Sequence, residues 1–114
     1  MAGLAAAGTA YTGDLTFYAT GLGSCGLTSG YNDPIVAVSH FIMDTYNPGN
    51  PNNNPLCGRD VTITFGGKDF QAKVVDTCGG CAEGDLDLSE GFFSEVTGGQ
   101  MSRGRIGDVQ WKWT

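Results

Sequence analysis

The stretch "VVDTCGGCAEGDLDLSEGFF", residues 74–93, joins the end of a β-strand pattern to the start of a helix and carries two cysteines and five carboxylates. Its apolar start predicts a strand that ends at the Cys78-Gly-Gly-Cys81 motif. Two of its carboxylates, Asp76 and Asp87, lie eleven residues apart. The question is whether such carboxylates cleave a bond or only hold a ligand.

The segments around this stretch predict further short strands. Residues 13–21, "GDLTFYATG", alternate apolar and hydroxyl side chains, the period of two that is typical of a half-buried strand. Residues 35–39, "IVAVS", have the composition of a buried strand, and residues 60–76 form two alternating strands joined by a glycine pair. Residues 105–114 place Val109 and both tryptophans on one face of a last strand. We therefore expect about six strands.

Two short helices are expected between these strands. Residues 39–46 predict one or two helical turns with Ser39 as the N-cap. Asp87 precedes Glu90 by three residues, which is the acidic relative of a capping box and predicts Asp87 as the N-cap of a helix near residues 88–97.

Length and composition limit the class of protein. The chain has 114 residues, which favours one domain with an open site rather than a cleft between lobes. Its 19 glycines, spread without a period, indicate many tight turns and an all-β fold. The net charge of -6 disfavours nucleic acid and anionic membranes as partners. The N-terminal "MAGLAAAGTA" is too short to span a bilayer.

Four cysteines in a small acidic domain predict two disulfides, and hence a secreted, extracellular protein. They are Cys25, Cys57, Cys78 and Cys81. The chain has one histidine and no zinc-type spacing, so we expect neither a metal site nor a cofactor. The residues alone leave all three pairings of the four cysteines open.

The order of the motifs "TFY", "GSCG", "IVAVS", "LCG", "VVDTC", "LDLS" and "GDVQWKW" resembles the double-psi β-barrel domain of the expansin superfamily, most of all the barrel-only fungal loosenins. The resemblance covers residues 13–114 and leaves residues 1–12 as an N-terminal tail. It implies an all-β, six-stranded double-psi barrel with two short helices. It also implies the pairs Cys25–Cys57 and Cys78–Cys81, and a monomer.

The resemblance also bears on catalysis. Inverting glycosidases need a general acid and a general base on opposite sides of the bond. Asp87 matches the acid position of related endoglucanases, whereas their base position holds Thr20, whose hydroxyl cannot activate water at neutral pH. Nearby carboxylates, Glu83, Asp85 and Asp76, are expected to raise the pKa of Asp87. We therefore predict a protein that does not hydrolyse its ligand.

The function that the resemblance implies is non-hydrolytic loosening of cell-wall polysaccharide, cellulose or chitin, in an open surface groove. Carboxylates and hydroxyls of the groove would hydrogen-bond sugar hydroxyls. The expected polysaccharide-binding residues are Thr16, Tyr18, Asp76 and Asp87, and the possible aromatic contacts are Tyr31, Tyr46 and Trp111.

Other interpretations stay open at this point. Asp87 can act as a helix cap alone, Glu83 and Asp85 can form a solvated acidic loop, and Trp111 and Trp113 can belong to the core. A weak endoglucanase or a lytic transglycosylase of the same barrel is the main alternative function. A protease inhibitor or another interaction protein is the third.

Overall fold

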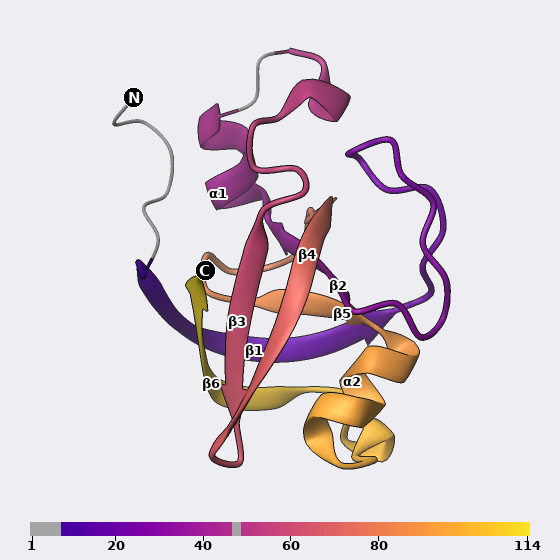
Figure 1. Cartoon of the computed structure of the whole chain (residues 1–114), viewed down its shortest axis with the longest axis vertical. Coiled ribbons are helices and arrows are strands. Elements are labelled where there is room, and N and C mark those ends of the chain that lie inside the picture. The colour runs from indigo at the N-terminus through magenta and orange to yellow at the C-terminus, as the bar shows by residue number, and fades with distance from the viewer. Residues whose placement is uncertain (1–7, 47–48) are drawn as a thin grey trace.

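The computed structural model describes residues 8–46 and 49–114. Six strands close into a barrel in the order β1-β5-β2-β4-β3-β6 (Figure 1). The strands are β1 Ala10–Tyr18, β2 Ile35–Ser39, β3 Asp60–Phe65, β4 Lys68–Cys78, β5 Leu86–Ser89 and β6 Ile106–Trp113. The predicted six-stranded, all-β double-psi barrel is confirmed.

The sheet is mixed, which distinguishes it from a chain of hairpins. The pairs β1–β5 and β2–β4 are parallel, and the remaining neighbours are antiparallel. The only hairpin between consecutive strands in the described barrel is β3–β4, which turns at Gly66 and Gly67. Both glycines have positive φ, as a two-residue hairpin turn requires. The glycine pair in the sequence therefore predicted this turn correctly.

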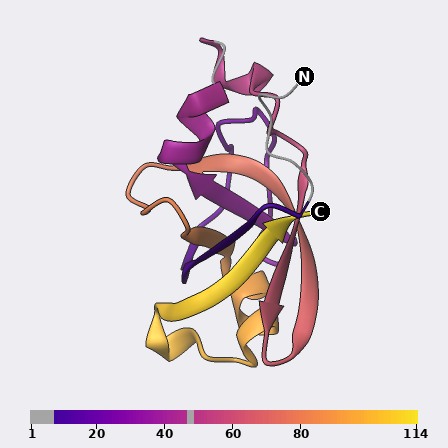
Figure 2. The ribbon, with the colours of Figure 1, turned by 90° about the vertical axis from the view of Figure 1, so that its left-hand side faces the viewer.

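Two short α-helices cap the ends of the barrel, α1 (His40–Met43) and α2 (Glu90–Thr97) (Figures 1 and 2). Ser39 caps α1 as predicted, because its side chain accepts a hydrogen bond from the amide of Phe41. Three 3₁₀ turns complete the described elements: η1 Asp44–Tyr46, η2 Pro51–Asn53 and η3 Met101–Arg103.

The predicted cap of the second helix is wrong. Asp87 lies inside β5, and Ser89 caps α2 by accepting a hydrogen bond from the amide of Phe92. The parallel pairing of β5 with β1 keeps the backbone extended through Ser89. The strand pairing therefore overrides the local capping signal, and α2 begins at Glu90.

The first strand begins and ends earlier than the sequence predicts. It runs from Ala10 to Tyr18 rather than over residues 13–21, because residues 10–13 pair with β6. Residues 10–12, which were expected to belong to the N-terminal tail, are therefore part of β1.

Apolar side chains of all six strands and of both α-helices fill the barrel. The largest of them that are fully buried include Trp111, Trp113 and Phe93. In the described part of the chain, no helix has the length and apolar character needed to cross a membrane.

Candidate functional site

An open groove of about 410 Å³ lies over the neighbouring strands β1, β5, β2 and β4. Its lining residues are Thr16, Phe17, Tyr18, Ala37, Asp76, Thr77, Cys78, Gly79, Gly80, Cys81, Asp87 and Arg105. All four predicted polysaccharide-binding residues are among them, so the structure brings them together in one site.

The strand register explains why these residues meet. Thr16 pairs with Asp87, Asp87 pairs with Ala37, and Ala37 pairs with Asp76. The four residues therefore form one row across four strands, and side chains in such a row point to the same face. The two aspartates flank the methyl group of Ala37 at a backbone separation of about 10 Å, two strand spacings.

Asp87 is half-buried in this row. Thr16 Oγ1 donates a hydrogen bond of 2.9 Å to Asp87 Oδ1. Burial raises the pKa of Asp87 above its ordinary value, the hydrogen bond from Thr16 lowers it, the charge of Asp76 raises it and Arg105 lowers it. The predicted direction is confirmed, but burial is the first cause, and Asp76 is the carboxylate that contributes.

Asp76 is held by the structure around it. Its Oδ1 accepts hydrogen bonds of 2.8 Å from the amides of Ser24 and Thr77. Tyr18 also donates to the Asp76 carboxylate, and burial together with the charge of Asp76 raises the pKa of the Tyr18 phenol well above its usual range. Tyr18 therefore stays a neutral donor, and Asp76 joins β4 to the loop that carries Ser24.

A charged cluster adjoins the groove. Arg105 Nη1 lies 2.8 Å from Asp14 Oδ2 and 3.8 Å from Asp85 Oδ2. Asp85 is 8% exposed and accepts hydrogen bonds from the amides of Asp14 and Ala82, so it is a structural carboxylate rather than part of a solvated acidic loop. Glu83 is exposed, as that interpretation expected.

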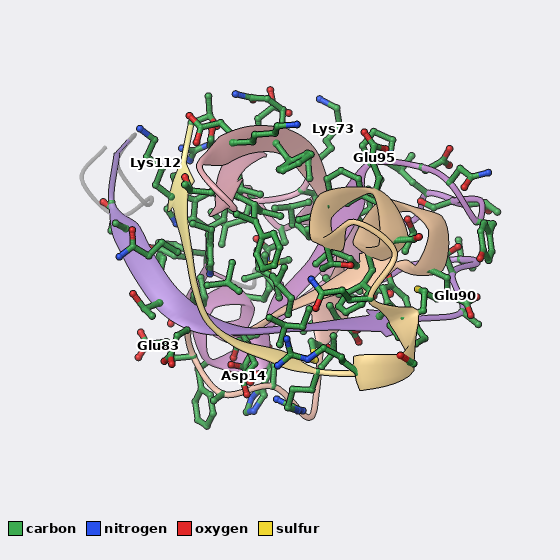
Figure 3. All side chains as sticks on the ribbon, turned by 90° about the horizontal axis from the view of Figure 1, so that it is seen from below. Asp14, Lys73, Glu83, Glu90, Glu95 and Lys112 are labelled. Atoms are coloured by element: carbon green, nitrogen blue, oxygen red, sulfur yellow. A yellow bond between two sulfur atoms is a disulfide. The ribbon has the colours of Figure 1, made fainter. Side chains whose placement is uncertain are left out.

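Figure 3 shows Asp14 and Glu83 at the edge of the barrel opposite Lys73 and Lys112. The acidic residues Asp76 and Asp87 line the groove itself, where Arg105 is the one cationic lining residue that the described chain supplies. The groove therefore favours neutral or cationic ligands over anionic ones.

The predicted aromatic contacts do not join the groove. Trp111 is only 2% exposed and donates from Nε1 to the carbonyl of Gly84, so it is a core residue and its expected role in ligand contact is wrong. Tyr46 lies in η1, which follows α1, and packs against the core. Tyr31 is 56% exposed, yet it lies on the loop before β2 and does not line the groove.

Thr20 follows the end of β1 by two residues and is likewise absent from the groove lining. The sequence missed Arg105, which only the fold brings beside Asp14. The sequence analysis also missed that Gly79 and Gly80 form a turn that lines the groove. The disulfide expected between Cys78 and Cys81 was a signal that this turn is rigid. No group of three or more His, Cys, Asp or Glu residues suited to a metal ion occurs in the described ranges.

Both disulfides have the pairing that the resemblance implied. Cys25 bonds Cys57 over a sequence separation of 32, and Cys78 bonds Cys81 over a separation of 3. The second one closes the Gly79–Gly80 turn that lines the groove. The first one ties the loop between β1 and β2 to the segment before β3.

No family model matches the chain. A papain inhibitor from Streptomyces mobaraensis is 32% identical over 111 residues, which cover 92% of this chain and 72% of that protein. The chain belongs to the papain-inhibitor family. The solved Streptomyces papain inhibitor agrees with this assignment, with a TM-score of 0.84 at 29% identity over 97% of this chain and 99% of that chain.

Two fungal allergens also match this member of the papain-inhibitor family. Allergen Asp f 7 of Aspergillus fumigatus is 37% identical over 110 residues, and its homologue in Arthroderma benhamiae is 34% identical over 121 residues. These matches cover 91% and 96% of the chain but only 37% and 41% of the allergens. The chain thus spans about two fifths of their length.

More distant structures share the fold. An expansin of Clavibacter michiganensis has a TM-score of 0.70 at 24% identity over 93% of this chain and 50% of that chain. A mutant of that expansin was solved in complex with cellohexaose. Cerato-platanin 3 of M. perniciosa has a TM-score of 0.63 at 21% identity. At these identities the similarity shows that the chain shares the barrel fold of these proteins, and it assigns no activity to the chain.

Proposed function

We propose that the protein is a secreted, non-hydrolytic, monomeric polysaccharide-binding protein that takes β-1,4-linked chains, cellulose or chitin, in its groove and loosens their contacts. The observation that carries this proposal is the row of Thr16, Asp87, Ala37 and Asp76, with Tyr18 beside it. Acceptor oxygens, a neutral phenol and a hydroxyl over one open face suit the alternating hydroxyls of a neutral glycan. The cellohexaose complex of the expansin neighbour supports the choice of ligand.

The geometry disfavours hydrolysis in spite of two carboxylates in the groove. Asp87, with its raised pKa, resembles a general acid. Asp76 would have to activate water, but one of its oxygens already accepts two backbone amides and the carboxylate also binds Tyr18. A carboxylate held in this way is positioned as a structural and ligand-binding group. The proposal therefore assigns no catalytic residue and no cofactor.

Two further properties support the proposal. The net charge of -6 and the acidic groove repel anionic polymers, which favours uncharged glycans. Two disulfides in a chain of this size are typical of an oxidising, extracellular setting.

The test compares binding with cleavage. The protein is mixed with microcrystalline cellulose, with chitin and with a negatively charged peptidoglycan preparation, and the fraction bound and the reducing sugar released are measured. We expect binding to cellulose or chitin that Asp87→Asn weakens, without release of reducing ends. Sugar release that Asp87→Asn abolishes would establish the endoglucanase alternative, and release of non-reducing anhydro products from peptidoglycan would establish the lytic one.

Inhibition of a papain-type cysteine protease is a second candidate function. It is favoured by the membership of the papain-inhibitor family and by the match along almost the whole solved inhibitor. A titration of papain with the protein, followed with a fluorogenic peptide, tests it directly. A tight complex would give inhibition that saturates near one protein per enzyme.

A further inference from the structure

We propose that residues 21–29, called here the 21–29 loop, are the element that docks into the substrate cleft of a papain-type cysteine protease, with Leu22 and Leu27 as the apolar anchors. This inference rests on the second proposed function and assigns it a surface outside the groove. The loop belongs to the segment between β1 and β2, which stands out from the side of the barrel (Figure 1).

Both leucines of the 21–29 loop are exposed. Leu22 is 75% exposed and Leu27 is 51% exposed. They are two of the four large hydrophobic residues that the described structure leaves exposed, and they share one loop. Exposed apolar side chains that gather on one element mark candidate interaction sites, so this pair offers a contact surface.

The loop is rigid, because its own backbone closes it. The amide of Gly23 donates to the carbonyl of Leu27 at 2.9 Å, and the amide of Ser29 donates to the carbonyl of Gly21 at 3.0 Å. Leu22 and Thr28 form an isolated antiparallel bridge. The two leucines therefore stand at opposite sides of one narrow turn.

The loop is also fastened to the barrel. Cys25 at its centre forms the disulfide with Cys57, and its amide donates to the carbonyl of Val75. Ser24 binds Asp76 through its amide and Thr77 through its hydroxyl, both at 2.8 Å. The polar centre of the loop thus faces β4, and the leucines on either side of it are left for a partner.

These features fit a protease cleft better than they fit a sugar. Proteases of this type bind substrates as extended chains in a groove with apolar side-chain pockets. A closed, projecting loop can place two leucines in such pockets while its hydrogen-bonded backbone resists the extended form needed for cleavage. Because the loop is already ordered, little conformational entropy is lost on binding.

The experiment measures inhibition constants for papain with the full chain and with Leu22→Ser, Leu27→Ser and the double variant. Phe41→Ser is the matched control, because Phe41 is 59% exposed on α1 and lies outside the loop. All variants change exposed side chains, and thermal unfolding checks that they remain folded. Cellulose binding of each variant is measured in parallel.

We expect each single variant to raise the inhibition constant about tenfold, and the double variant to raise it further, because buried apolar anchors carry much of the energy of an interface. Phe41→Ser should leave inhibition unchanged, and no variant should change cellulose binding. If the double variant inhibits like the unmodified protein, the loop inference is overturned while the inhibitor function stands. If the unmodified protein does not inhibit papain, both are overturned. Loss of cellulose binding in the leucine variants, with inhibition intact, would assign the loop to the glycan instead.

Discussion

Thr16 donates from Oγ1 to Oδ1 of Asp87 at 2.9 Å, across the parallel pairing of β1 with β5. The two residues are 71 positions apart, so only the closed barrel brings them into contact. The bond fixes the orientation of a groove carboxylate whose pKa the structure raises.

Replacing Asp87 by Asn should weaken ligand binding while leaving the stability of the fold nearly unchanged. The Asn side-chain oxygen can still accept from Thr16, so the free energy of unfolding should change by less than about 1 kcal/mol. Loss of the charge should weaken binding of cello-oligosaccharides about tenfold, the size of one charge-assisted hydrogen bond. Calorimetric titration and urea unfolding measure the two quantities.

Asp69→Asn is the matched control for that variant. Asp69 accepts a hydrogen bond of 2.8 Å from Thr64 at the β3–β4 hairpin, away from the groove lining. It should leave oligosaccharide binding unchanged. Equal weakening by both variants would show that net charge, and not the groove, governs binding.

Stability should depend on pH through Asp87 with a defined sign. Because its pKa is raised in the folded protein, the folded state holds this proton more tightly than the unfolded chain. Asp87 therefore favours folding below its ordinary pKa, and this contribution is lost as the pH rises through the raised value. The stability of the wild type relative to Asp87→Asn should fall across that window and then level off. Urea unfolding of both proteins from about pH 3 to about pH 7 measures it. A difference that grows with pH would show that the pKa is lowered instead.

The two disulfides should contribute unequally to stability. Loop entropy predicts that removing the Cys25–Cys57 disulfide, which spans 32 positions, lowers the free energy of unfolding by about 3–4 kcal/mol. Removing the Cys78–Cys81 disulfide, which spans 3 positions, should lower it by about 1.5 kcal/mol. Both cysteines of a pair are replaced by Ala in each double variant. Denaturant unfolding of the two double variants checks the order. Equal losses would mean that the short bridge stabilises the groove wall by more than chain entropy.

Gly13 should not tolerate a side chain. A Cβ at this position would collide with the backbone carbonyl of Gly84, where β1 passes the start of β5. We expect Gly13→Ala to destabilise the fold by several kcal/mol, the upper end for single substitutions. Gly21→Ala is the control, because open space surrounds that position and it should cost less than about 1 kcal/mol. Similar midpoints of urea unfolding for both variants would contradict the close approach.

Local patterns predicted the local parts of the fold. The alternation on both sides of Gly66 and Gly67 predicted the β3–β4 hairpin, and Ser39 before an apolar run predicted the cap of α1. The composition of the chain predicted disulfides, whereas their pairing came from the resemblance to expansins, since spacing alone left three choices.

The errors occurred where pairing over long sequence distances decides the structure. Asp87 and Glu90 have the spacing of a cap, but β1 keeps Asp87 in a strand. Asp85 looks solvated in the sequence, yet it is buried against the amides of Asp14 and Ala82. Arg105 has no local signal as a groove residue, because its link to Asp14 spans most of the chain. Four of the groove residues were nevertheless expected, because the motifs of the resembling family mark them.

The order of strands in the barrel has a consequence for how the protein reaches its structure. The first strand pairs only with β5 and β6, the last two strands of the chain. Its edges therefore stay unpaired until β5 and β6 have emerged from the ribosome. Closing such long loops before any contact forms is slow, and folding in the range of milliseconds to seconds is typical of this topology. During that interval the alternating apolar face of β1 and its unpaired edges are exposed, and this is the stage of folding at which aggregation competes most strongly.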